Sequence, residues 1–426
     1  MRSILFYIPA EIAGAPVFGV GLLLAAWLLV AVLGGLWLAR RPGGAREAAG
    51  FVPLVLIIAA VIVFLLPGMV ERDASGRLLG VPIRGFGVML MLATVAGVGL
   101  AARRAWQAGI DPDAIYSLAF VMFVAGIVGA RIFYLIEYGH EFICRTPQGG
   151  IDLAATVRAM LNVTQGGLVV YGSVLAAVPA GIWFCRRRGL PVLQVGDVIA
   201  PGMVLGLAVG RIGCFLNGCC FGGVCPTASY AVSFPPGSPP YVYQQQAGWQ
   251  SGVWLEEAEG RVKVAYVAPA SAAAEAGVAA GQTVAAVNGS PVGSLSEARA
   301  RVAEGGPAYE LRTAEGQTLR WVAVAAPARS VPIHPAQLYA AIDAGLLALV
   351  LWLYFPLRRR DGEVFALMLT LHPISRFFLE MIRSDEPGQF GTELTISQWL
   401  SLGLISAAAV LWWYVEHTPR STGRGS

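Results

Sequence analysis

Ionisable side chains lie inside long apolar stretches of this sequence, where burial in a membrane is costly and marks functional positions. Within 363–382, His372, Arg376 and Glu380 are spaced four residues apart, so a helix places all three on one face. Arginine binds phosphate oxygens through a planar bidentate fork. Several cations at one membrane face therefore predict a site for a phospholipid phosphate. The further cations near the ends of apolar stretches are Arg131, Arg211, His334 and Arg383.

A purely structural interpretation of these residues is the alternative. Arg376 and Glu380 can form an ion pair that only stabilises the helix. Arg131 and Arg383 can extend to lipid head groups. The set favours phosphate binding, because the topology read from the arginine pattern brings these cations to one membrane face.

The segment GRIGCFLNGCCFGGVCP, Gly210 to Pro226, contains four of the six cysteines. Their spacing, C-x4-C-C-x4-C, lacks the C-x2-C pairs typical of zinc sites and encloses no histidine, so no metal site is predicted. A compartment outside the cytoplasm permits disulfides, so Cys214 or Cys220 could pair with Cys225, and Cys144 is a further partner. Reduced, packed cysteines are the alternative.

Composition identifies the elements that must position these residues. Of the 426 residues, 56% are hydrophobic and only 13% are charged, and mean hydropathy is +0.64. A soluble domain carries about 25% charged residues. The sequence therefore predicts an all-α polytopic membrane protein with about nine transmembrane helices of roughly 20 residues each. The predicted spans are 17–39, 51–68, 85–102, 115–136, 167–185, 195–217, 336–356, 363–382 and 396–415.

Basic clusters set the expected orientation of these spans. Arginines follow every odd-numbered span, as at 103–104, 186–188 and 358–360. Because basic residues stay on the cytoplasmic side, we expect the N-terminus outside and the C-terminus inside. The first apolar run is too long for a signal peptide, so cleavage is not expected. The net charge of +4 is small and clustered at span ends, which gives no sign of nucleic-acid binding.

The character of the chain changes between residues 227 and 331, where charged residues return and long apolar runs end. VSFPPGSPPY, 232–241, predicts a proline-rich linker without helix. RVKVAYVA, TVAAVNG and YELRTAEG predict strands, with turns at Asn288-Gly289 and Glu315-Gly316. SLSEARARV predicts a short helix capped by Ser294 or Ser296. We therefore expect a small β-rich extracytoplasmic insertion between the sixth and seventh spans.

The insertion resembles a PDZ domain of the bacterial protease type, through VAPASAAAEAGVAAGQTVAAVNGSPV, 267–292, and the helix that follows. The resemblance covers roughly residues 246–326 and implies a domain that adds a peptide strand to a sheet edge. It places GWQSGVWL, 248–255, where that family binds a peptide carboxylate. A spacer that binds no peptide is the alternative. The implied peptide-binding residues are Gly248, Trp249, Gly252 and Val253.

Four motifs of the apolar part resemble bacterial prolipoprotein diacylglyceryl transferases. They are GRIGCFLNGCCFG (210–222), HPAQLYAA (334–341), GGLVVYG (166–172) and SRFFLEMIRSDE (375–386), with support from GARIFY at Gly129 and IRGFGVML at Ile83. The resemblance covers 83–222 and 332–415. It implies an enzyme of the bacterial inner membrane that moves diacylglyceryl from phosphatidylglycerol to the lipobox cysteine of a preprolipoprotein. The products are a thioether and glycerol phosphate, and no cofactor is implied.

The resemblance also implies roles for individual residues. Arg211 and Arg376 match family arginines that handle phosphate. The residues expected to act in catalysis are Arg211, Arg376, Glu380, His334 and Tyr171. Those expected to bind lipid or phosphate are Arg211, Arg131, Arg383, Asn217, Gly218, Gly222 and Phe86.

Four positions depart from the family pattern. Tyr171 stands where the family has histidine, Phe86 where it has tyrosine, Cys214 where it has asparagine and Cys219 where it has an acidic residue. A thiol with a pKa of about 8.5 needs only about 2 kcal/mol to ionise near pH 7. Losing phosphate stabilisation costs about 3–4 kcal/mol. The retained arginines therefore matter more than the missing histidine, and the alternative bases are His372, His334 and Glu380.

These departures leave two other functions open: a related transferase with a different lipid donor or thiol acceptor, and a non-catalytic membrane-anchored peptide binder.

PVFGVGLLLAA from Pro16 and PIRGFGVMLML from Pro82 share a pattern, so the first helices could be a partial duplicate. The expected partners are phosphatidylglycerol, preprolipoproteins, membrane lipids and a peptide ligand of the insertion. The expected organisation is two additional helices in 1–80, a first transferase part in 81–226, linker and PDZ-like domain in 227–331, a second transferase part in 332–416 and a cytoplasmic tail in 417–426.

Overall fold

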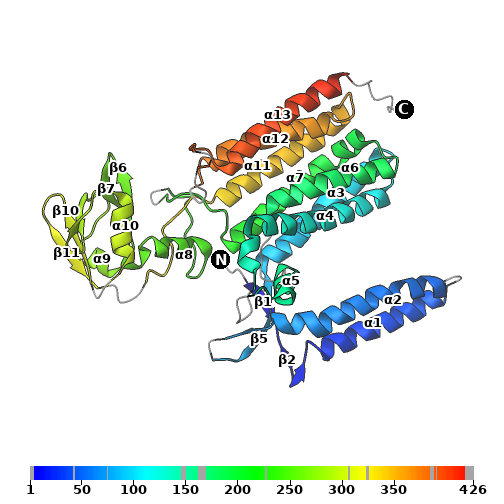
Figure 1. Cartoon of the computed structure of the whole chain (residues 1–426), viewed down its shortest axis with the longest axis horizontal. Helices are drawn as coiled ribbons and strands as arrows, with labels where there is room; N and C mark the ends of the chain where they lie inside the picture. The colour runs from blue at the N-terminus through cyan, green and yellow to red at the C-terminus, as the bar shows by residue number, and fades with distance from the viewer. Residues whose placement is uncertain are drawn as a thin grey trace.

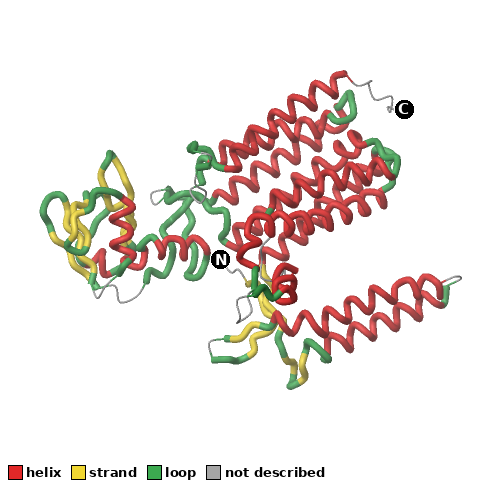
Figure 2. Tube along the Cα trace, in the orientation of Figure 1, coloured by secondary structure: helices red, strands yellow, loops and turns green. Residues whose placement is uncertain are grey.

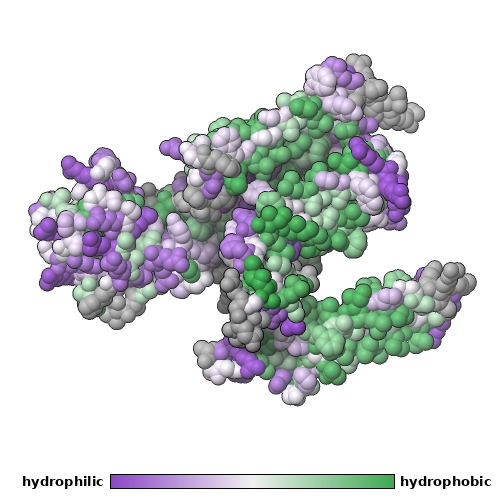
Figure 3. Space-filling view, viewed as in Figure 1, coloured by the Kyte–Doolittle hydropathy of each residue, from purple (hydrophilic) through white to green (hydrophobic). Residues whose placement is uncertain are grey.

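Helices form most of the computed structural model, and strands are confined to the N-terminal region and to the insertion (Figure 1, Figure 2). Within the part of the chain that the structure describes, seven helices are long and apolar enough to cross a membrane. Apolar surface follows the helices, whereas the β-rich insertion is largely hydrophilic (Figure 3). The protein is therefore an integral membrane protein with a polar insertion. The structure describes residues 4–41, 44–73, 75–144, 150–161, 169–225, 228–305, 308–322, 326–383, 388–389 and 391–417.

The long helices agree closely with the predicted spans, because apolar runs that end in glycine, proline or arginine define both. α6 and α12 are not among the seven helices that meet the length and apolarity required of a span, so nine spans stay a prediction. The helices are α1 (Leu22–Ala39), α2 (Gly44–Ala60, continued by η1, Val61–Leu65, and η2, Leu66–Met69), α3 (Gly85–Gln107), α4 (Pro112–Tyr138), α6 (Val170–Arg187), α7 (Val192–Asn217), α11 (Ala336–Tyr354), α12 (Glu363–Glu380) and α13 (Ile396–His417). Shorter helices are η3 (Gly139–Phe142), α5 (Leu153–Leu161) and η5 (Phe355–Leu357).

A small sheet joins the first two long helices to the rest of the chain. It has the order β1-β5-β4, with β1 at Ile4–Ile8, β5 at Leu78–Arg84 and β4 at Glu71–Arg72. A separate hairpin pairs β2 (Glu11–Ile12) with β3 (Ala15–Pro16). β5 leads directly into α3, whereas α1 and α2 pack on each other as an apolar hairpin apart from the bundle (Figure 1). This sheet was not expected from the sequence, because β1 and β4 are short and β5 is interrupted by Gly80 and Pro82.

Glycines allow the helices of the bundle to approach closely. A Cβ at Gly97 of α3 would lie 2.7 Å from the carbonyl oxygen of Gly202 in α7. A Cβ at Gly129 of α4 would lie 2.5 Å from the carbonyl oxygen of Gly172 in α6. Packing of small residues is the usual basis of helix association in membranes. Two motifs of the sequence, GARIFY and GGLVVYG, thus supply helix contacts.

The buried carboxylate of Asp197 fixes the start of α12. It accepts hydrogen bonds from the backbone N–H groups of Gly362 (2.7 Å) and Phe365 (2.9 Å). Arg358 forms an ion pair with it at 3.4 Å. An anion is favourable at a helix N-terminus, so Asp197 both caps and orients the helix that carries Arg376 and Glu380.

The described part of the insertion is built from two antiparallel sheets, three short α-helices and one 3₁₀ turn. β6 (Val253–Ala258) pairs with β7 (Arg261–Val267), and a bridge from Lys263 to Thr283 links this pair to a second sheet of order β11-β10-β8-β9. The predicted strands at β7, β8 and β10 are confirmed, as is the helix capped by Ser294, whose hydroxyl accepts from the Glu297 N–H at 3.3 Å. The remaining bounds are α8 (Pro239–Gln246), η4 (Trp249–Ser251), α9 (Ala272–Glu275), β8 (Val284–Val287), β9 (Ser290–Pro291), α10 (Leu295–Ala303), β10 (Tyr309–Thr313) and β11 (Thr318–Trp321).

One prediction for the insertion is wrong. VSFPPGSPPY was expected to lack helix, but α8 begins at Pro239, with both prolines in its first turn. Proline is tolerated there because its missing N–H would have no intrahelical partner. At the base of the insertion, Val224 and Val232 each form a β-bridge with Ile333. The chain therefore leaves and re-enters the membrane part at one place.

Candidate active site

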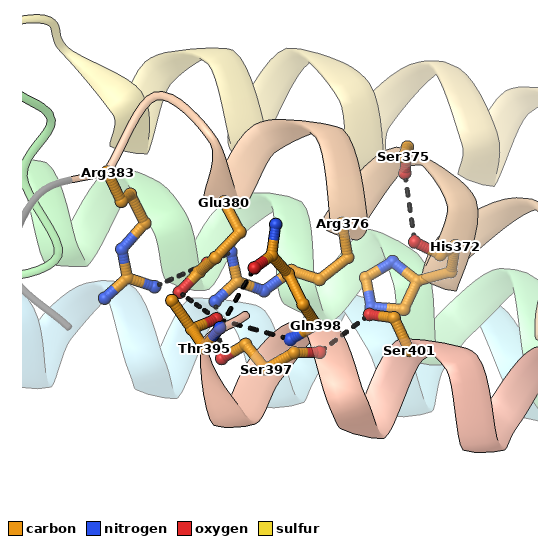
Figure 4. A network of polar contacts seen from close by, with 9 residues as sticks. All are labelled: His372, Ser375, Arg376, Glu380, Arg383, Thr395, Ser397, Gln398 and Ser401. Carbon is orange, nitrogen blue, oxygen red and sulfur yellow. Dashed lines mark hydrogen bonds and ion pairs between the residues drawn. The ribbon is translucent and has the colours of Figure 1, made fainter. Parts of the chain in front are cut away.

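The predicted stripe of polar residues on α12 is present. Glu380 is only 2% exposed and forms an ion pair with Arg376, one turn earlier. Arg383, just beyond the helix, lies 3.3 Å from the same carboxylate oxygen of Glu380. Figure 4 shows the carboxylate between the two guanidinium groups. One buried carboxylate thus holds two arginines side by side.

The start of α13 supplies polar partners to this stripe. The Thr395 hydroxyl donates to the second oxygen of Glu380 at 3.4 Å, and Arg376 donates to the Ser397 hydroxyl at 3.2 Å (Figure 4). Gln398 accepts from the backbone N–H of Thr395 at 3.0 Å. The sequence analysis missed these residues. Their signal was polar side chains spaced three or four apart at the start of an apolar helix.

The GRIGCFLNGCCFG motif forms the end of α7 and the turn that follows. Gly218 ends the helix with φ +79°, the left-handed conformation that glycine adopts readily. The Gly218 N–H donates to the Cys214 carbonyl at 2.8 Å. A Cβ at Gly218 would contact Phe234 at 3.3 Å. Asn217, the last helical residue, is half-buried beside this turn.

Gly222 brings three distant motifs into backbone contact. Its N–H donates to the His334 carbonyl at 3.1 Å, and the next N–H, of Gly223, donates to the Ile382 carbonyl at 2.9 Å. A bridge also pairs Gly222 with Arg383. A Cβ at Gly222 would lie 2.7 Å from the Cβ of His334, so no larger residue fits this junction.

His334 lies among aromatic rings rather than among charges. Its Nδ1 is 3.4 Å from the Tyr339 hydroxyl, and its ring centroid is 5.9 Å from that of Tyr230. Gln337, from the same motif, is 1% exposed and donates to the Cys219 carbonyl at 2.7 Å. The sequence analysis missed Gln337 as a residue that ties HPAQLY to the cysteine turn. The feature of the sequence that indicates Gln337 is an amide side chain inside an otherwise apolar helix.

Arg211 differs from the other arginines of the site. Its half-buried guanidinium makes no hydrogen bond or ion pair with any residue that the structure describes. Its charge acts on both His372 and Cys220, so it lies between α12 and the cysteine turn. With no hydrogen bond or ion pair to a described residue, this cation at the end of a membrane helix is available to an anion.

Arg131 is held by the protein itself. Its guanidinium donates to the carbonyls of Met160 (2.9 Å) and Ala159 (3.1 Å) at the end of α5, and lies 5.5 Å from the Tyr134 ring. A cation at a helix C-terminus is stabilising. Arg131 thus anchors α5, and its role in lipid binding stays a prediction.

Tyr171 and Phe86, two of the family departures, lie at different places. Tyr171 is half-buried in the first turn of α6, and its hydroxyl has no hydrogen bond to a described residue. The Phe86 ring packs at Gly213, where a Cβ would approach it to 3.3 Å. Of the GGLVVYG motif, residues 166–168 lie outside the described residues, as do 384–386 of SRFFLEMIRSDE.

His372, the third residue of the stripe, and Asp343 of α11 complete this part of the site. Nδ1 of His372 is buried without a hydrogen-bond partner among the described residues, and the charges acting on this ring include Asp343 and Arg211. Asp343 accepts from the Ser375 hydroxyl at 2.8 Å. Asp343 was missed, although an aspartate inside the apolar run 336–356 was its signal.

The cysteine turn gathers three of its four thiols. The Sγ atoms of Cys214, Cys219 and Cys220 all lie within 4.8 Å of one another. All six cysteines are free thiols, so none of the disulfides considered from the sequence is present. Among the described residues, this cluster is the one group of side chains close enough to hold a metal ion.

The four residues predicted to bind a peptide carboxylate lie in and beside η4. Trp249 is 1% exposed and donates to the Arg329 carbonyl at 2.9 Å, and Val253 is also buried in the core. Trp249 and Gly252 line a pocket of about 530 Å³ that reaches residues 326–330. Gly248 packs against Val302 of α10, where a Cβ would lie 2.7 Å from its side chain. The loop thus couples the insertion to its connection with the bundle.

The family of the chain is clear from sequence comparison. A family model for prolipoprotein diacylglyceryl transferase matches residues 76–414. The phosphatidylglycerol–prolipoprotein diacylglyceryl transferase of Rhodopirellula baltica is 35% identical over the full length of this chain and 92% of its own. That of Synechococcus elongatus is 33% identical over 33% of this chain and 45% of its own length, and a second such enzyme of Clostridium perfringens is 22% identical over 80% and 94%. The chain therefore belongs to the prolipoprotein diacylglyceryl transferase family.

Proposed function

We propose that this protein transfers diacylglyceryl from phosphatidylglycerol to the cysteine thiol of prolipoproteins, the activity for which its relatives are named. The observation that carries the proposal is the Arg211 guanidinium, which has no partner among the described residues and shares its surroundings with Arg376 beside His372 and with Arg383 beside Cys220. Such a cluster matches the phosphate of an anionic phospholipid. No nucleophile is needed from the chain, because the substrate thiol attacks.

The reaction defines what the protein must supply. A thiolate displaces a phosphate ester from the glyceryl carbon, and negative charge develops on the leaving phosphate oxygen. Arg211 and Arg376 stabilise that charge in a site where low polarity strengthens the interaction. Glu380 keeps Arg376 and Arg383 together in the absence of lipid, since it neutralises part of their charge.

The test is the variant Arg211→Ala assayed with labelled phosphatidylglycerol and a lipobox peptide. Loss of one preorganised donor to a developing anion typically lowers kcat by about 100-fold to 1,000-fold. Arg211→Lys keeps the positive charge but loses the planar guanidinium that can bind two phosphate oxygens at once, so we expect partial activity. Arg186→Ala, an exposed arginine at the far end of α6, is the matched control. Wild-type turnover in Arg211→Ala would refute the assignment.

The orientation in the membrane is a further part of the proposal. We place the N-terminus outside, the C-terminus in the cytoplasm of a bacterium, and the insertion outside the inner membrane, with α6 and α12 as additional spans. Arginine clusters after alternate spans support this orientation. Alkaline phosphatase fused within the insertion should be active outside the cytoplasm, and the same reporter after His417 should be inactive. The reverse pattern of reporter activity would mean that the insertion faces the cytoplasm and that the proposed orientation is wrong.

The insertion is proposed to be a PDZ-like module that recruits the protein substrate. The helix α10 packs along β6, as such modules require for strand addition. Arg299 of α10 donates to the Leu255 carbonyl on β6 at 2.9 Å, and burial lowers the pKa of its guanidinium. An incoming peptide strand must therefore displace Arg299 from that carbonyl. Arg299→Ala should strengthen peptide binding, measured by fluorescence anisotropy with the full chain in detergent.

A further inference from the structure

Local backbone geometry creates the cluster formed by Cys214, Cys219 and Cys220. Cys214 lies in the last turn of α7, and the left-handed Gly218 reverses the chain immediately after it. Cys220 itself has φ +56°, which is uncommon for a residue with a side chain. The turn brings all three Sγ atoms within 4.8 Å of one another. Three thiolates bound to one zinc ion at about 2.3 Å lie about 3.8 Å apart, so small shifts complete the site.

The surroundings of the cluster fit a metal rather than a sealed apolar core. All three cysteines are half-buried, so a face of the cluster stays accessible. Arg211 and Arg383 are the cations that act on Cys220. Three thiolates and one divalent ion carry a net charge of −1, which these arginines balance. Gln337 holds the Cys219 carbonyl at 2.7 Å and fixes the turn.

The donor set identifies the class of metal. Thiolates select soft or borderline ions such as zinc and exclude magnesium and calcium, which require oxygen ligands. Structural zinc sites have four protein ligands, whereas catalytic sites have three and keep one position for a substrate. Three cysteines beside the arginines proposed to bind phosphate match a catalytic zinc site, which has three protein ligands and one open position.

We propose that Cys214, Cys219 and Cys220 bind one zinc ion whose fourth ligand is the thiol of the lipoprotein substrate. The proposal rests on the transferase function given above. A thiol coordinated to zinc is deprotonated, and its proton is released to water. The sulfur pair then attacks the glyceryl carbon, and the bond from that carbon to the phosphate oxygen breaks. Glycerol phosphate leaves with the bonding pair, and the neutral thioether, a weaker ligand, dissociates from the metal.

The site accounts for three departures from the family pattern together. Cys214 and Cys219 replace an asparagine and an acidic residue, and each supplies a ligand. Tyr171 replaces a histidine, and a metal-bound thiolate needs no such base. The sequence predicted no metal site, because C-x4-C-C spacing differs from that of common zinc motifs. The turn at Gly218 removes this objection by bringing the three sulfurs together.

The first test measures metal binding by the full-length chain in detergent under reducing conditions. Wild type should bind one equivalent of Zn²⁺, and Co²⁺ should give the absorption bands of tetrahedral thiolate coordination. Losing a residue that only hydrogen-bonds to a metal ligand already weakens metal binding about tenfold to 100-fold, so losing a ligand in Cys214→Ser, Cys219→Ser or Cys220→Ser should weaken metal binding by more than 100-fold. Cys225→Ser, from the same loop but outside the cluster, is the matched control. Absence of stoichiometric metal in folded wild type, or a disulfide within the cluster, overturns the proposal.

The second test uses the Co²⁺-loaded chain and a lipobox peptide. A peptide with cysteine should shift the cobalt bands, and the same peptide with serine should not. An unchanged spectrum with both peptides would mean a purely structural metal and would overturn the role in thiol activation. Size-exclusion profiles and melting temperatures of the serine variants show whether a loss of binding reflects unfolding.

The two proposals fail in different ways. Full transfer activity after the metal has been removed by a chelator contradicts the zinc site and leaves the transferase assignment intact. Metal binding and a cysteine-dependent spectral shift without any lipid transfer contradict the assignment and leave the thiol site intact. Loss of transfer on chelation, with recovery on adding Zn²⁺, supports both.

Discussion

Arg376 and Glu380 form an ion pair across one turn of α12, and almost all of the Glu380 side chain is buried. The same carboxylate also contacts Arg383 and Thr395. It therefore neutralises two cations at once and ties the end of α12 to the segment before α13. Removing it leaves two neighbouring arginines with no carboxylate between them.

Glu380→Ala is expected to lower the free energy of unfolding by about 3–5 kcal/mol, the usual effect of breaking a buried ion pair. Thermal unfolding in detergent measures this loss. Glu380→Gln keeps the shape and some hydrogen bonds, so it should lose less. The double variant Arg376→Ala/Glu380→Ala should regain part of the stability of Glu380→Ala. A loss in the double variant equal to the sum of the losses in Arg376→Ala and Glu380→Ala would show that the pair is not coupled.

Gly222→Ala should abolish transfer, because the added Cβ would lie 2.7 Å from the Cβ and 2.8 Å from the carbonyl oxygen of His334. The clash separates the cysteine turn from HPAQLY. Gly210→Ala, in the same motif, adds a Cβ to open space and should keep full activity. Activity and melting temperature of the two variants decide the matter. Equal activity and equal melting temperature in the two variants would contradict the close contact between Gly222 and His334.

Asp197→Ala should destabilise the protein by about 3 kcal/mol, since it leaves the start of α12 uncapped and removes the buried one of the two carboxylates that pair with Arg358. Transfer activity should fall together with the melting temperature, because α12 carries Arg376. Asp113→Asn, an exposed acidic residue in the first turn of α4, is the control and should change stability by less than about 0.5 kcal/mol. An unchanged melting temperature in Asp197→Ala would contradict the capping role.

Replacing residues 235–329 with a short glycine-rich turn should leave the membrane part folded. Phe234 and Ser330 exchange two hydrogen bonds, of 2.9 Å between backbones and 2.8 Å to the Ser330 hydroxyl, so they are natural ends for excision. We expect an unchanged kcat with a short lipobox peptide and a raised KM with a full-length prolipoprotein. An unchanged KM for both substrates would exclude recruitment by the insertion.

Periodicity predicted the parts of this protein that depend on local sequence. Apolar run length placed the long helices, and the spacing of His372, Arg376 and Glu380 predicted one polar stripe. Of the two serines expected to cap α10, Ser294 and Ser296, Ser294 is the cap. In each case a residue is positioned by neighbours within two turns, so the information lies in one short segment.

Contacts between distant segments were not predictable in this way. Spacing alone did not bring Cys214 to Cys219 and Cys220, because that depends on the φ of Gly218 and Cys220. The partners of Glu380 on the start of α13 depend on how two helices pack. Likewise, the backbone contact of Gly222 with His334 joins segments that are separated by the whole insertion.

The paired base of the insertion has an evolutionary consequence. Val224 and Ile333 form a β-bridge at the point where the insertion begins and ends. The insertion is therefore a loop whose two ends are held together by the membrane part. The entropic cost of closing such a loop grows only with the logarithm of its length, about 0.6 kcal/mol for each doubling. A segment of any size could have been gained, exchanged or lost here at almost no thermodynamic penalty to the enzyme beneath it. This position is therefore where relatives should differ most in length while their membrane parts stay alike.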